Sequence, residues 1–221
     1  MVGVTTDLAA SGEQHRGQLR MAYRLATRWG DRLRHAPGLG WYIWDGARWA
    51  PDRDGGTTRA VVDTIKAAYR ELPDLARVER DALYSDIRKA ESASGVAGVL
   101  TLTAALKPIA VTPDRLDSDP YLFNMPNGTL DLRTGEVRPH NPDDLITRVA
   151  GAELDLSASG TAWGRFVSEV LPDEDVRFFA QRVFGLAMLG EVREYVLPIF
   201  TGTGLNGKGT MAGPRELIQG L

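Results

Sequence analysis

A glycine-rich segment near the C-terminus carries the residues best suited to chemistry. In TGTGLNGKGT, residues 201–210, Gly202, Gly207 and Lys208 match the skeleton G-x-x-x-x-G-K. The backbone N–H groups of such a loop cradle phosphates, and its lysine reaches the β- and γ-phosphates of a nucleoside triphosphate. Lysine is scarce in this chain, and composition alone gives roughly 0.05 chance matches to the skeleton. The sequence therefore predicts a phosphate-binding loop.

The expected magnesium ligand departs from the motif. The residue after the lysine, normally Ser or Thr so that its hydroxyl can bind Mg²⁺, is Gly209, and Thr210 comes one position later. Either Thr210 serves as the ligand or groups elsewhere hold the metal. Residues 195–200, YVLPIF, are an apolar run typical of a buried parallel strand. A plain glycine-rich turn between this strand and a helix is the structural alternative.

An arginine row marks the N-terminal region. Apolar residues recur every three or four positions over residues 14–34, which predicts an amphipathic helix. Its opposite face carries five arginines, which are Arg16, Arg20, Arg24, Arg28 and Arg32. This row could follow the phosphate backbone of a nucleic acid. It could instead be the solvated side of a surface helix, so both interpretations stay open.

The middle of the chain predicts helices and small antiparallel sheets. Asp45-Gly46 indicates a two-residue hairpin turn within residues 40–52, whose tryptophans could stack on bases or fill a small core. Helices are predicted over residues 59–71, 74–92 and 94–106. Turn signals predict a three-stranded meander over 121–148. Two further helices are expected over 161–171 and 173–189, the second of them buried because its apolar residues are dense.

Composition excludes several classes of protein. The chain has 221 residues, of which 43% are hydrophobic and 25% charged, so it is neither disordered nor fibrous. The absence of cysteine excludes disulfides and thiolate zinc sites. No apolar run approaches the roughly 20 residues that span a membrane, so we expect no membrane association. The net charge of −3 gives no overall basic signal for nucleic acid.

Four segments in order resemble one family. WYIWDGARW, NGTLDLRTGE, FGLAMLG and GTGLNGKGT are similar to phage and plasmid primase-helicases, whose motor is a superfamily-three helicase of the AAA+ type. The resemblance covers about residues 34–210. It implies an α+β fold, in which a mainly helical domain with a hairpin and meander precedes the first strand, P-loop and helix of an incomplete α/β ATPase. The expected parts are an arginine-rich helix (1–35), an accessory domain (36–190) and the start of the ATPase domain (191–221).

The resemblance also implies an activity, ligands and partners. It implies ATP-driven unwinding with ATP and Mg²⁺, single-stranded or forked DNA as partner, and a homo-oligomeric ring. It places the protein in the cytoplasm of a bacterial host, encoded by a phage, prophage or plasmid. Lys208 is the implied catalytic residue and Thr210 the implied Mg²⁺ ligand. The implied nucleotide-binding residues are Gly202, Thr203, Gly204, Leu205, Asn206, Gly207, Lys208, Gly209 and Thr210.

Few residues follow the loop. The stretch after Lys208 is long enough for one short helix, so we expect the Walker B acid and the arginine finger of the motor to be missing. The chain alone is then expected to bind nucleotide weakly and not to hydrolyse it. Two other hypotheses stay open, namely a non-enzymatic module that binds DNA or a replication partner, and an inactive prophage remnant.

Overall fold

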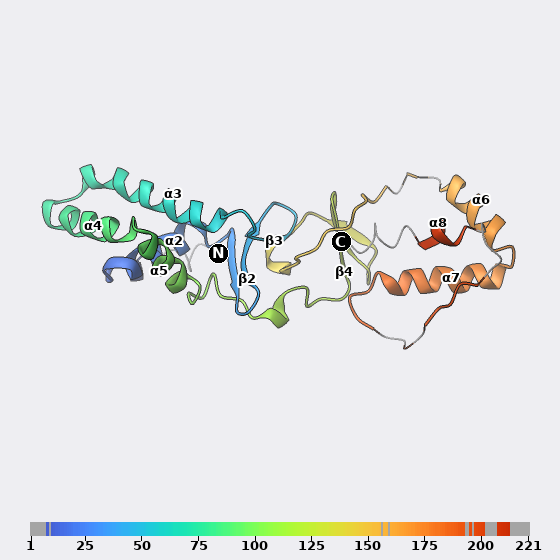
Figure 1. Cartoon of the computed structure of the whole chain (residues 1–221). Coiled ribbons are helices and arrows are strands. Elements are labelled where there is room, and N and C mark those ends of the chain that lie inside the picture. The colour runs from blue at the N-terminus through green and yellow to red at the C-terminus, as the bar shows by residue number, and fades with distance from the viewer. Residues whose placement is uncertain are drawn as a thin grey trace. The chain divides into compact units, whose positions relative to one another are not determined.

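The computed structural model describes residues 8, 10–155, 157–158, 160–192, 195, 197–201 and 207–212. The chain divides into two compact units, a first unit of Met1–Asp45 with Trp49–Leu116 and a second unit of Gly46–Arg48 with Asp117–Leu221. Helices and two three-stranded antiparallel sheets make up the described part (Figure 1), which confirms the expected α+β class. The division after Leu116 lies inside the stretch expected to be one accessory domain.

In the part of the first unit that the structure describes, four longer helices accompany one sheet, and residues 10–13 are also helical. The helices are α2 (Gly17–Trp29), α3 (Gly56–Glu71), α4 (Arg77–Ala90) and α5 (Ala93–Thr103), and a 3-10 turn (Leu72–Asp74) joins α3 to α4. The sheet has the order β1 (Leu33–Ala36), β2 (Gly40–Trp44), β3 (Trp49–Pro51), with both pairs antiparallel. A second 3-10 turn covers Pro113–Arg115. The three helices predicted between residues 59 and 106 are confirmed, with shifted ends.

The predicted helix over residues 14–34 is wrong at its C-terminal end. The helix ends at Trp29, and Leu33–Ala36 form strand β1, whose residues pair with Gly40–Ile43 of β2. Leu33 and Ala36 are buried there. Cross-strand hydrogen bonds and this burial outweigh the helical periodicity, because propensity is a weak prior that tertiary contacts override.

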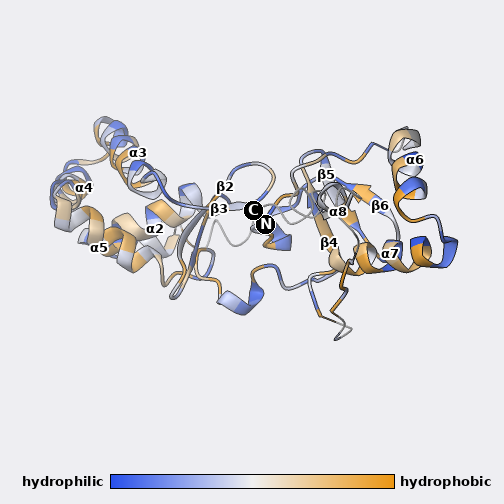
Figure 2. Cartoon of the chain, turned by 45° about the vertical axis from the view of Figure 1, so that its right-hand side comes forward, coloured by the Kyte–Doolittle hydropathy of each residue, from blue (hydrophilic) through white to orange (hydrophobic). Residues whose placement is uncertain are grey.

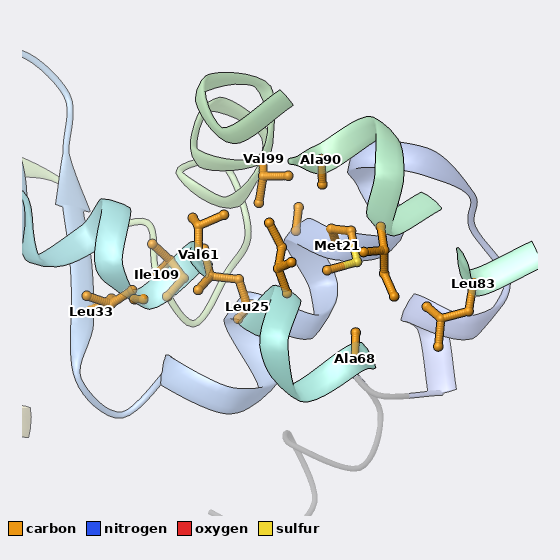
Figure 3. Close-up of a cluster of buried hydrophobic side chains, with 14 residues drawn as sticks. Met21, Leu25, Leu33, Val61, Ala68, Leu83, Ala90, Val99 and Ile109 are labelled. Carbon is orange, nitrogen blue, oxygen red and sulfur yellow. The ribbon is translucent and has the colours of Figure 1, made fainter. Parts of the chain in front are cut away.

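Helix α2 lies at the centre of the first unit and packs against α3, α4 and α5. Its residues Met21 and Leu25 meet Val61, Leu83 and others in a cluster of fourteen buried side chains (Figure 3). The arginines of this helix, Arg20, Arg24 and Arg28, do not belong to the cluster. The apolar stripe that the sequence predicts on this helix is therefore confirmed as its core face.

The hairpin loop is longer than predicted. Trp44 of β2 pairs with Trp49 of β3, so the loop contains four residues, Asp45–Arg48, and not two. Gly46 has φ +105°, a conformation that favours glycine. Trp49 is completely buried, with the Arg34 guanidinium 4.4 Å from its ring, and Trp41 packs against the helical core. For these two tryptophans the core interpretation holds, and not the base-stacking one.

Asp52 caps helix α3 from four residues upstream. Its carboxylate accepts hydrogen bonds from the Gly56 amide (2.8 Å), the Thr57 amide (2.9 Å) and the Thr57 hydroxyl (2.6 Å). Partial burial opposes ionisation, but the Thr57 hydroxyl and the two amides lower the pKa of Asp52 from 3.8 to about 2. Two of the unpaired N–H groups at the start of α3 are thereby satisfied.

Acid is expected to remove the contribution of Asp52 to stability. Because its folded pKa lies below the unfolded value of 3.8, the cap stabilises the fold above pH 3.8, and the stabilisation is lost as the pH falls through about 2. Chemical unfolding of wild type and Asp52→Asn should differ by about 1 kcal/mol at neutral pH and converge near pH 2. Asp63→Asn, exposed on α3, is the control. A difference that stays constant over this pH range contradicts the capping role.

The second unit contains the predicted meander. Its strands β4 (Leu122–Met125), β5 (Gly128–Asp131) and β6 (Glu136–Arg138) pair in sequence order. A 3-10 turn (Pro142–Asp144) follows, then α6 (Thr161–Val170), α7 (Glu174–Ala187) and α8 (Lys208–Ala212). Asp173 caps α7 by accepting bonds from the Asp175 and Val176 amides. The meander and both longer helices are confirmed.

Two predictions for the second unit are wrong. Helix α7 is predicted to be buried, yet Phe178 and Phe179 are 54% and 55% exposed. Figure 2 colours the residues of α7 by their hydropathy. The apolar run before the loop was expected to be a buried strand, yet residues 195 and 197–200 form no strand and their large apolar side chains are exposed. A strand of this kind is buried only between neighbouring strands, and none of β4–β6 pairs with the described residues of this run.

Candidate functional site

The phosphate loop is described only at its end. Gly202, Thr203, Gly204, Leu205 and Asn206 lie outside the described residues, so their predicted role is not placed in space. Gly207 has φ +79°, and helix α8 begins at the next residue, Lys208. A Cβ on Gly207 would lie 2.7 Å from Val170 Cγ1 and 2.9 Å from the Phe166 ring. Both the backbone conformation and the lack of space therefore require glycine at this position.

A cavity adjoins helix α8. It has a volume of about 660 Å³, and Met211 of α8 lines it together with side chains of α6 and α7. Most of these residues are apolar, and they include Trp163, Val167, Phe178, Ala180 and Phe184. Glu174, Arg177 and Gln181 add a few polar groups. Mostly apolar walls with few polar groups are typical of small-molecule sites.

The described part of the chain offers no cluster of metal ligands. It contains no group of three or more His, Asp or Glu side chains placed to hold a metal ion. Thr210, the implied Mg²⁺ ligand, lies in the first turn of α8 and is exposed, as is Gly209. Binding of Mg²⁺ through the Thr210 hydroxyl therefore stays a prediction.

The structure splits the arginine row of α2. Arg28 and Arg32 are exposed, and the Arg32 guanidinium lies 6.0 Å from the centre of the Trp29 ring. Arg16, Arg20 and Arg24 form ion pairs with acidic side chains. The C-terminal end of the row is therefore exposed to solvent, as expected for the face of a surface helix. Towards the other end Arg20 is buried. The row is thus not one continuous surface.

Asp86 of α4 anchors the N-terminus of α2. Its carboxylate, 1% exposed, accepts hydrogen bonds from Arg16 Nε (2.9 Å), the Gly17 amide (2.8 Å) and Arg20 Nη1 (3.4 Å). A negative charge at this end of the helix also interacts favourably with the helix dipole. Asp86 therefore joins α4 to α2, and two arginines of the row satisfy its charge.

Arg24 and Glu13 form the second part of this network. Arg24 donates to Glu71 Oε2 and Glu13 Oε1, both at 2.7 Å, and Arg20 Nη2 also donates to Glu13. Burial opposes ionisation of Glu13, but the bonds and charges of Arg20 and Arg24 lower its pKa below the usual value. Burial likewise opposes the charge on Arg24, while Glu71 and Glu13 raise its pKa. The shifted pKa values keep both Glu13 and Arg24 charged at neutral pH.

Sequence reasoning identified the arginines but not their acidic partners. Asp86 carries a signal in hindsight, since it shares the spacing of Leu83, Ile87 and Ala90, the buried residues of α4. A carboxylate on an apolar helix face must find a cationic partner when it is buried. Glu13 and Glu71 carry no such signal.

Comparison with known proteins gives one family match. A family model described as D5 N terminal like matches residues 22–172, about two thirds of the chain. The match runs from within α2 to just beyond α6, and so includes both sheets. A search of curated proteins gives no match. Among the described residues, no helix has the length and apolar character needed to cross a membrane.

Proposed function

Because the chain belongs to the D5 N-terminal-like family, we propose that it works in DNA replication as part of a phage or plasmid primase-helicase in the bacterial cytoplasm. The domain of this family is found at the N-terminus of phage and plasmid primase-helicase proteins. The family match covers both sheets and the helices from within α2 to α6, whereas α7 lies between the matched residues and the glycine-rich loop. A homo-oligomeric ring is part of this proposal, since the resemblance implies one.

We propose that residues 202–210, the glycine-rich loop, bind ATP. The observation that carries this step is the geometry of Gly207, which combines φ +79°, no room for a Cβ and a helix that starts at the motif lysine. Loop N–H groups would bind phosphate oxygens, and the Lys208 ammonium would neutralise the β- and γ-phosphates. Thr210 would hold Mg²⁺. Unwinding further requires a water-polarising acid and an arginine finger, which we propose other parts of the motor supply.

The test is equilibrium binding of nucleotides to the full chain in the presence of Mg²⁺. Because the loop recognises the terminal phosphates, we expect saturable ATP binding and about tenfold or greater weakening for AMP. Isothermal titration calorimetry measures both. Equal affinity for ATP and AMP, or no binding of either, contradicts the proposal.

DNA is the proposed macromolecular partner. The family relation to replication supports it, and so does the net positive charge of the first unit. The first unit contains 16 Lys and Arg against 14 Asp and Glu, whereas the second contains 10 against 15. The exposed arginines Arg28 and Arg32 place positive charge at the C-terminal end of α2. Phosphate contacts of this kind make affinity for DNA fall with salt.

A further inference from the structure

Two arginines in α2 converge on a single carboxylate. Arg24 Nη2 donates to Glu13 Oε1 at 2.7 Å, and Arg20 Nη2 donates to Glu13 Oε2. The other terminal nitrogen of each guanidinium is bound to a different acid, Asp86 for Arg20 and Glu71 for Arg24. The two Nη2 groups therefore meet at one point, and the Glu13 carboxylate occupies that point.

The hydrogen-bonding capacity of this pair is only partly used. Nε of Arg20 and Nε of Arg24 are buried, and neither has a hydrogen-bond partner among the described residues. In a guanidinium, the Nε–H and one Nη2–H lie along the same edge and bind oxyanions as a fork. At each fork the Nη2 group donates to Glu13, while the Nε–H makes no hydrogen bond with the described residues. A phosphate, which offers more oxygens than a carboxylate, could fill both forks.

Ion pairs are the main contacts that hold Glu13. Residues 10–13 form a helical turn and none of residues 10–15 belongs to the apolar core. Gly12 and His15 of this segment lie against Tyr23 of α2. Glu13 is 49% exposed, whereas the side chains of Arg20 and Arg24 are 8% and 18% exposed. Partly exposed pairs of this kind contribute little stability. An external anion can therefore compete with Glu13 for arginines that the fold already holds in place.

The net charge of the groups around Arg20 and Arg24 favours the binding of an anion once Glu13 is displaced. Arg16, Arg20 and Arg24 face Asp86 and Glu71, so the cluster without Glu13 has one more positive than negative charge. With Glu13 present the cluster is neutral. The carboxylate thus supplies the one negative charge that an external ligand would bring.

We propose that Arg20 and Arg24 form a binding site for a nucleic-acid phosphate, which Glu13 occupies as an internal substitute until the nucleic acid displaces it. This masked anion site lies on the helix that also presents the exposed Arg28, and the exposed Arg32 follows shortly after the helix ends. The inference rests on the proposed DNA partner, but not on ATP binding at Lys208.

The test is binding of a fluorescein-labelled single-stranded oligonucleotide to the full chain at low salt. Glu13→Gln should bind about three- to tenfold more tightly than wild type, because the internal competitor loses its charge. Glu79→Gln is the matched control, since it removes the same charge from an exposed residue of α4. A gain of equal size in Glu79→Gln, or no gain in a folded Glu13→Gln, overturns the proposal. No binding by wild type and by Glu13→Gln alike would instead count against the DNA partner itself.

A second variant separates the site from effects on folding. Arg24→Gln should change affinity little in wild type, where Glu13 already occupies the arginine, but it should abolish the gain in Glu13→Gln. Circular dichroism melts ensure that wild type, the two single variants and the double variant Glu13→Gln/Arg24→Gln are compared while folded. Additive effects of the two substitutions would overturn the masked site.

Inorganic phosphate serves as the second probe and distinguishes the source of the anion. Millimolar phosphate should compete with the oligonucleotide on Glu13→Gln only weakly, because one phosphate lacks the neighbouring contacts of a nucleic-acid strand. Phosphate that saturates the site as readily as the oligonucleotide would assign it to the free anion, and the proposed source would be wrong.

Discussion

Replacing Asp86 by asparagine is expected to lower the free energy of unfolding by about 3–5 kcal/mol. Asparagine has nearly the same shape and can still accept the Gly17 amide, but it lacks the charge. Arg20, whose side chain is 8% exposed, then keeps only the partly exposed Glu13 as its anionic partner, and a buried charge that loses its buried counter-charge is expensive. The N-terminus of α2, the central helix of the first unit, also loses the negative charge that caps it.

Urea unfolding followed by circular dichroism measures this effect, and Asp81→Asn is the matched control. Asp81 lies on the same helix, but its side chain is exposed, and its ion pair with Arg77 Nε is long, at 3.9 Å. Its replacement should cost less than about 0.5 kcal/mol. The cost at Asp86 should persist in high salt, because buried pairs are screened little. Equal losses for the two variants would show that the Asp86 network does not hold the fold.

Replacing Lys208 by alanine is expected to weaken ATP binding about tenfold to a hundredfold. A charge-assisted contact to phosphate is worth about 1.5–3 kcal/mol, and the motif assigns Lys208 to the β- and γ-phosphates. Helix α8 begins at this residue, so the substitution keeps a good helix former at the first helical position. The fold of the first unit should be unchanged.

Lys66→Ala is the matched control for this prediction, because Lys66 is an exposed lysine on α3 in the first unit. Calorimetric titration with ATP and Mg²⁺ compares the three proteins. Wild type and Lys66→Ala should bind alike, with Lys208→Ala much weaker. Equal affinities in all three would show that the loop is not the nucleotide site.

Local patterns predicted most of the secondary structure. The helices between residues 59 and 106 follow from apolar spacing and from Pro73 and Pro108, and the meander follows from Pro126-Asn127-Gly128 and its second turn. These signals act within a few residues of the chain, which is why the sequence alone reveals them.

Such local patterns do not predict which residues far apart in the sequence contact each other. Leu33 and Arg34 belong to the helical periodicity of residues 14–34 but pair with β2 as part of strand β1. Arg16 and Asp86 are 70 positions apart, and periodicity identifies the face of a helix without identifying what covers it. The same limit explains α7, whose apolar density predicts burial although α6 and α8 leave Phe178 and Phe179 exposed. Of the candidate site, only the motif and the arginine row could be read in advance.

Mapping the ATP site by nuclear magnetic resonance tests the central claim most directly. Uniformly ¹⁵N-labelled full chain is titrated with ATP and Mg²⁺ while the backbone amide signals are followed. The account predicts that the largest shifts fall on the signals of Gly202–Thr210, and that they disappear in Lys208→Ala. ATP that shifts none of these signals, or shifts a different set equally in both proteins, would contradict it.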